Sequence, residues 1–178
     1  MQKIQKIISL ILTALGLMKK QAEIITPVFV SRETVLSEPT PLTNTEKLCR
    51  VAISYLGKDA SPKDLASDGL GCAESISNII HEVFPDFQSG ILGTDSLKYA
   101  LNKSPHFKQI LYPQKGCIII SPRTATEYGH VGIMLDGGGI ASNNSKTGTF
   151  DVNYNWDLWI KTFGAKGRRL YTYIYEVI

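Results

Sequence analysis

Three short runs between residues 115 and 145 decide the fold class: KGCIIISP (residues 115–122), GHVGIML (129–135) and GIASNNS (139–145). Each run is rich in apolar or alternating residues and is bounded by turn residues, which is the pattern of a β-strand. The residues DGGG (136–139) between the second and third runs predict a tight hairpin. These runs therefore predict strands of an antiparallel sheet.

Helical patterns lie on both sides of these strands. In chain order, the remaining predicted elements are a helix within TNTEKLCRVAISYLG (43–57), a helix from Cys72 to Phe84, a helix in TDSLKYALNKS (94–104), a short helix in NWDLWIKTFG (155–164) and a last strand in RLYTYIYEVI (169–178). Apolar residues in the first two helices recur at the i, i+3, i+4, i+7 spacing of a helix with one buried face. Asn44 or Thr45 is expected to cap the first helix. Helices followed by an antiparallel sheet predict an α+β domain.

The first 20 residues differ from the rest of the chain, because an uncharged and mostly apolar run from Ile7 to Met18 lies between lysines. This run is shorter than the roughly 20 apolar residues of a transmembrane helix, and no A-x-A-like cleavage site follows it. We expect an uncleaved membrane anchor or an interfacial helix, with a helix that packs on protein as the alternative. Residues 21–43, rich in Pro, Ser and Thr, are predicted to form a linker, so the compact domain is expected over residues 44–178.

Composition and charge exclude several classes of function. The 178 residues have a formal net charge of +3, and without a basic run or a basic and aromatic stripe we expect no nucleic-acid partner. The three cysteines show no CxxC spacing, and their odd number argues against a disulfide framework or a cysteine-rich zinc site. Because the histidines are also scattered, we expect no metal and no cofactor.

Cys72 has an unusual position, because it follows Gly69 and Gly71 at the first turn of a predicted helix. Backbone N–H groups and the helix dipole at such a position favour a thiolate, and the same amides can hold an oxyanion. Cys49 and Cys117 occupy an apolar helix and an apolar strand, and we interpret both as packing residues.

His130 is the most plausible base for such a thiol. It begins the run GHVGIML after the polar loop PRTATEYG (122–129), where an imidazole can stay accessible while neighbouring residues enter the core. A catalytic thiol needs a base that takes its proton and later protonates the leaving amine. The pairing of Cys72 with His130 therefore predicts nucleophilic catalysis.

A glycine-flanked Cys that opens a helix, followed by a strand, GHVGI, a hairpin and a strand with a polar residue, resembles the NlpC/P60 and CHAP group of papain-like cysteine peptidases and amidases. The resemblance covers about residues 43–178. It implies N-terminal helices packed on a small, barrel-like antiparallel sheet. It also implies a Cys72 nucleophile and a His130 base that cleave a peptide or amide bond of peptidoglycan.

The third member of the implied triad is an amide or a carboxylate. Asn143 is the first choice, because an Asn on the next strand can accept the imidazole N–H and fix its orientation. Asn144 would take this role if the strand began one residue later, and Asp136 in the hairpin is a further alternative. Glu74, Ser75 and Tyr128 are candidates for substrate binding.

The sequence leaves three candidate functions for this chain. The first is a peptidoglycan hydrolase held at the cell envelope through residues 1–20, as a bacterial cell-wall enzyme or a phage lysis or entry factor. The second is a cysteine-dependent amidase or acyltransferase that acts on another substrate. The third is a non-catalytic module of a virion or an envelope complex in which the thiol is inert.

Overall fold

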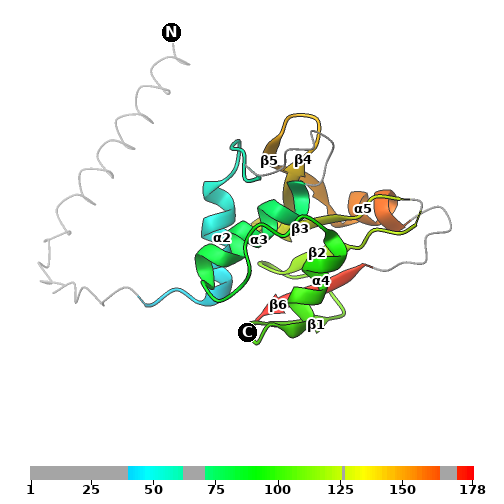
Figure 1. Cartoon of the computed structure of the whole chain (residues 1–178). Helices are drawn as coiled ribbons and strands as arrows, with labels where there is room; N and C mark the ends of the chain where they lie inside the picture. The colour runs from blue at the N-terminus through cyan, green and yellow to red at the C-terminus, as the bar shows by residue number, and fades with distance from the viewer. Residues whose placement is uncertain (1–39, 62–70, 126, 165–171) are drawn as a thin grey trace, which may run out of the picture. The chain divides into compact units, whose positions relative to one another are not determined.

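The computed structural model describes residues 40–61, 71–125, 127–164 and 172–178 of the chain. All described helices and strands belong to the compact unit Pro41–Ile178. That unit combines helices with a six-stranded antiparallel sheet (Figure 1). The predicted α+β class is therefore confirmed.

The helices lie close to where the apolar spacing predicts them. They are α2 (Asn44–Ser54), α3 (Gly71–Val83), α4 (Thr94–Lys103) and the short α5 (Trp156–Trp159), which a π-helical turn, η2 (Ile160–Gly164), continues. The predicted cap of the first helix is wrong by one or two residues. Thr43 is the N-cap, because its hydroxyl accepts a hydrogen bond from the backbone N–H of Glu46 while the Glu46 carboxylate accepts one from Thr43 N. This reciprocal capping box satisfies two backbone donors at once.

The sheet has the strand order β1-β6-β2-β3-β4-β5. The strands are β1 (Phe107–Ile110), β2 (Ile118–Ser121), β3 (His130–Met134), β4 (Gly139–Asn144), β5 (Thr149–Asn155) and β6 (Tyr173–Val177). The predicted strands correspond to β2, β3, β4 and β6, whereas β1 and β5 were not predicted. The hairpin between β3 and β4 contains Gly137 and Gly138 at φ of 75° and 79°, a conformation that favours glycine.

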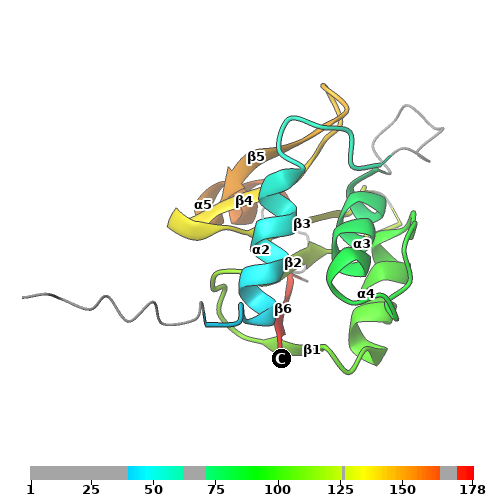
Figure 2. The same cartoon turned by 90° about the vertical axis from the view of Figure 1, so that its left-hand side faces the viewer.

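The sheet separates two apolar cores, and residues along β3 alternate between them. On one face, Val131 and Ile133 belong to a helix-side core together with Ile76 of α3. On the other face, Met134 packs with Trp159 of α5 in a second core, the α5-side core. Figure 2 shows α2 and α3 side by side on their face, and Figure 1 shows α5 away from them beyond β3 and β4. A side chain on β3 therefore faces either the helix that begins at Gly71 or the helix α5.

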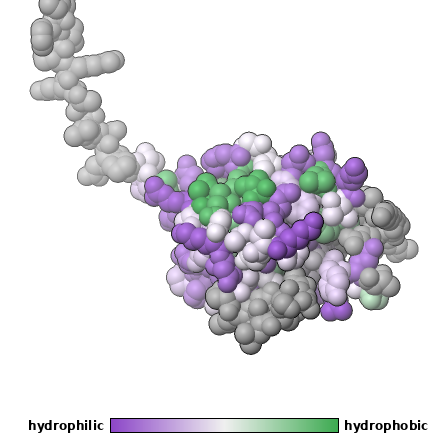
Figure 3. Space-filling model, turned by 90° about the horizontal axis from the view of Figure 1, so that it is seen from above, coloured by the Kyte–Doolittle hydropathy of each residue, from purple (hydrophilic) through white to green (hydrophobic). Residues whose placement is uncertain are grey.

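The outer surface of the described part is mostly hydrophilic in the view of Figure 3, with hydrophobic residues in small patches. Within the described ranges, every helix falls short of the length and apolar character needed to cross a membrane. The predicted membrane-contacting segment (residues 1–20) lies outside the described residues, as does the predicted linker up to residue 39. Residues 40–43 of that linker are described, and they precede α2 without helix or strand structure.

Candidate active site

His130, the first residue of β3, lies among aromatic rings on the α5-side face of the sheet. Its ring stacks on Trp159 and Phe163, with centroid distances of 5.5 and 5.2 Å, and meets the edge of Tyr154 at 5.4 Å. Trp159 is fully buried. This aromatic cage fixes the orientation of the imidazole and excludes water from much of its surface.

The polar partner of the ring is Ser142 on the neighbouring strand β4. His130 Nε2 lies 2.9 Å from Ser142 Oγ. Asn153 of β5 donates from Nδ2 to the same Oγ at 3.1 Å and to the Ser142 carbonyl at 2.9 Å. Three adjacent strands thus contribute one polar chain, His130–Ser142–Asn153, which holds one ring nitrogen and leaves Nδ1 without a hydrogen bond to any described residue.

Burial lowers the pKa of His130 to about 4, because the aromatic surroundings disfavour the charged imidazolium. The ring is therefore neutral at neutral pH. A neutral imidazole with one nitrogen held by a hydroxyl can accept a proton at the other nitrogen. The lowered pKa makes this nitrogen a weaker base than an exposed imidazole, because general-base catalysis is most efficient when the pKa lies near the operating pH.

Two glycines in GHVGIML make close packing around His130 possible. A Cβ at Gly132 would lie 2.7 Å from Ile140 Cγ2 and 2.8 Å from the Ala141 carbonyl oxygen. A Cβ at Gly129 would lie 2.3 Å from Thr94 Oγ1. All three distances are shorter than the contacts that real Cβ atoms make, so the chain requires glycine on either side of the His130–Val131 pair.

A cavity of about 450 Å³ opens beside His130. This volume falls within the range of small-ligand sites. Its lining combines aromatic rings, amides and hydroxyls with one lysine: Tyr128, Gly129, His130, Asn143, Asn144, Ser145, Lys146, Asn153, Tyr154 and Phe163. The imidazole is thus accessible to a ligand in this cavity.

Cys72 is the second residue of α3 and is only 3% exposed. It belongs to the helix-side core, and α3 packs against both β3 and β4. Cys72 does not line the cavity, and His130 lies on the other, α5-side face of the sheet. Burial raises the pKa of Tyr154, and the charge of the Cys72 thiolate raises it further. This electrostatic interaction links Cys72 to Tyr154, whose ring meets that of His130.

The ring contact that the sequence assigned to Asn143 is made by Ser142. Asn143 alternates with Ser142 along β4 and so has the opposite orientation. It still lines the cavity, at 5% exposure, and its Oδ1 is buried without a hydrogen-bond partner. The two alternatives are engaged elsewhere: Asn144 Oδ1 accepts from Lys146 N at 3.0 Å, and Asp136 forms an ion pair with Lys115 at 2.8 Å.

The residues predicted to bind substrate differ in exposure. Glu74 and Ser75 are fully buried in the first turns of α3, and Ser75 Oγ donates to the Gly71 carbonyl at 2.7 Å. Neither of these two side chains lines the cavity. Tyr128 is 72% exposed and does line it.

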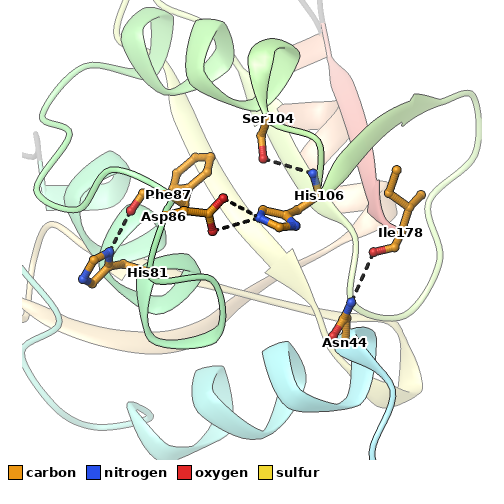
Figure 4. A network of polar contacts seen from close by, with 7 residues as sticks. All are labelled: Asn44, His81, Asp86, Phe87, Ser104, His106 and Ile178. Carbon is orange, nitrogen blue, oxygen red and sulfur yellow. Dashed lines mark hydrogen bonds and ion pairs between the residues drawn. The ribbon is translucent and has the colours of Figure 1, made fainter.

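The other histidines and cysteines have structural contacts away from the cavity. His81 Nδ1 lies 2.7 Å from the Phe87 carbonyl, and His106 Nε2 lies 2.9 Å from the Asp86 carboxylate, as Figure 4 shows. Burial raises the pKa of Cys49 and raises that of Cys117 to about 11. Within the described ranges, no three His, Cys, Asp or Glu side chains gather as a metal site.

Sequence reasoning did not identify Ser142 or Asn153. The available signal was strand alternation: Ser142 lies on the same face of the β3–β4 hairpin as His130, because Ile133 pairs with Ala141. Asn153 has no comparable signal, because the strand that carries it was not predicted.

A comparison with protein-family models gives no match, and a comparison with curated proteins gives none either.

Proposed function

We propose that the protein is a thiol hydrolase that cleaves a peptide or amide bond in the peptide part of peptidoglycan. Cys72 is the nucleophile and His130 the base, and Ser142 with Asn153 orients the imidazole. The observation that carries the proposal is the geometry of His130: one ring nitrogen is 2.9 Å from Ser142 Oγ, and the ring forms part of the wall of a cavity. The sequence resemblance to papain-like NlpC/P60 enzymes supports the same assignment.

The chemistry requires one tautomer of His130. With the proton on Nε2, the ring donates to Ser142 Oγ, and Nδ1 keeps the lone pair that accepts the thiol proton. The Cys72 thiolate then attacks the substrate carbonyl carbon, and the protonated imidazole gives its proton to the leaving amine as the C–N bond breaks. Water, deprotonated by the same imidazole, hydrolyses the resulting thioester and regenerates the thiol.

The position of Cys72 favours the first step. A thiol in the first turn of a helix interacts with the positive end of the helix dipole, which stabilises its thiolate. Backbone N–H groups of the same turn can bind the oxyanion that forms on the carbonyl oxygen. Catalytic hydrogen bonds in substrate-free enzymes are often long and tighten with substrate bound. The proposed chemistry therefore requires substrate binding to bring the Cys72 thiol and the His130 imidazole, which pack on opposite faces of the sheet, within hydrogen-bond distance.

Residues 1–20 and the linker after them would keep such an enzyme at the cell envelope. Full-length protein should therefore partition with membranes or vesicles of anionic lipid, whereas a variant that lacks residues 1–20 should not. Identical partitioning of the two proteins would contradict this location and leave the proposed chemistry intact.

The direct test is incubation of purified peptidoglycan with wild type, Cys72→Ala and Cys117→Ala, followed by mass analysis of released fragments. We expect release by wild type and by Cys117→Ala, which removes a thiol from the α5-side core, and none by Cys72→Ala. The fragment masses identify the bond. Absence of release by a folded wild type, or release by Cys72→Ala, contradicts the proposal.

A further inference from the structure

The charge balance of the cavity beside His130 indicates what it binds. Its described lining contains three amides and several hydroxyl or aromatic groups, but Lys146 is its one charged side chain, since His130 is neutral at neutral pH. No described residue forms an ion pair with Lys146. A cavity with one unpaired cation and no carboxylate in its described lining favours an anionic ligand over an ammonium group.

The β4–β5 turn holds the backbone of Lys146 in place. Asn144 Oδ1 accepts from Lys146 N at 3.0 Å, and the Asn144 carbonyl accepts from Gly148 N at 2.8 Å. Gly148 has φ of 71°, which a residue with a side chain rarely adopts. The turn therefore fixes the backbone of Lys146 beside the cavity, and the Lys146 side chain is exposed.

Asn143 adds a second recognition group. Its Oδ1 is a buried acceptor without a hydrogen-bond partner, in a residue that lines the cavity. Buried carbonyl oxygens are nearly always hydrogen-bonded in folded proteins. A ligand N–H would satisfy this oxygen, and a peptide provides such donors.

We propose that the cavity binds a peptide that carries a free carboxylate: Lys146 contacts the carboxylate, and the Asn143 amide oxygen accepts a backbone N–H of the peptide. The inference rests on the proposed function for its choice of a peptide, but it concerns binding and not cleavage. In this arrangement the cavity recognises its peptide by the free carboxyl end, and not by the amino end.

The test measures binding of two probes, acetyl-trialanine with a free carboxylate and its carboxamide, by calorimetry or NMR titration. Wild type should bind the carboxylate form more tightly by about threefold to fivefold, the range of an exposed ion pair. Lys146→Gln should remove this preference, Lys146→Glu should reverse it, and Lys47→Gln on the exposed side of α2 should leave it unchanged. Asn143→Leu should weaken the binding of both probes equally, because both probes contain the same backbone N–H groups.

The measurement is repeated in Cys72→Ala, where no thiol chemistry occurs. A preserved preference there supports the binding site whether or not peptidoglycan is cleaved. Equal affinity of wild type for the two probes, undetectable binding of the carboxylate form, or equal effects of Lys146→Gln and Lys47→Gln would overturn the inference. Such a result would leave cleavage by Cys72 as a separate question, answered by the fragment masses.

Discussion

His130 and Ser142 are hydrogen-bonded across the β3–β4 hairpin, with Nε2 2.9 Å from Oγ. The contact depends on strand register. Ile133 pairs with Ala141 and Met134 with Ile140, so the even-numbered residues of both strands share the face that carries Trp159. A single-residue slip would replace Ser142 by Asn143 or Ala141 opposite the imidazole.

Ser142→Ala should lower kcat/KM for fragment release by about tenfold to a hundredfold, because the imidazole loses the partner that fixes its orientation and tautomer. Asn153→Ala should have a smaller effect in the same direction, since Asn153 acts through Ser142. Steady-state kinetics on a soluble stem peptide would measure both. Ser142→Thr keeps the hydroxyl and should retain more activity than Ser142→Ala; equal activities of the two variants would mean that the hydroxyl has no positioning role.

Stability should fall in acid because of His130. Its pKa is about 4 in the folded protein, below the value of about 6.5 in an unfolded chain, so protonation favours unfolding. The stabilisation is complete above pH 6.5 and decreases as the pH falls toward 4, by roughly 2–3 kcal/mol. Urea unfolding at pH 7 and pH 4.5 should show a smaller loss in His130→Asn than in wild type. The same loss in both proteins would mean that the imidazole is not shielded from water.

Gly132→Ala should destabilise the domain by about 1–3 kcal/mol, as overpacking does. The new Cβ would lie 2.7 Å from Ile140 Cγ2 and 2.8 Å from the Ala141 carbonyl oxygen, between β3 and β4. Gly93→Ala is the control, because a Cβ there meets only Ser96 within 4 Å, at ordinary contact distances. Thermal unfolding of the three proteins checks the difference; equal midpoints for both variants would count against the close approach of the strands.

Apolar patterns were sufficient to predict most of the fold. Hydrophobic periodicity is the strongest structural signal in a sequence. The apolar residues in α2 and α3, and the run from Cys117 to Ile120, are buried where that periodicity predicts. The missing strands lack this signal. β1 has only four residues, two of them exposed, and β5 is rich in Asp and Asn, which have low β-propensity and are held here by pairing with β4.

The candidate site was predicted less completely, because its partners are defined by register across strands. His130 could be found from its position at the head of a strand. The hydroxyl of Ser142 and the amide of Asn153 come together only when β3, β4 and β5 pair in this register. Asn143, one residue away, was chosen for its chemistry, which alone does not determine the face of the strand on which a side chain lies.

The three cysteines permit the most direct measurement, the alkylation rate of each thiol by iodoacetamide at mildly acidic pH. Cys72, Cys49 and Cys117 are 3%, 4% and 0% exposed, so burial alone predicts similarly slow labelling of all three. The proposed chemistry predicts that Cys72 is modified at least about tenfold faster than the others, and that His130→Asn removes most of this excess. Cys72 reacting no faster than Cys49 and Cys117, or an equal rate in His130→Asn, would contradict a thiol activated by this imidazole.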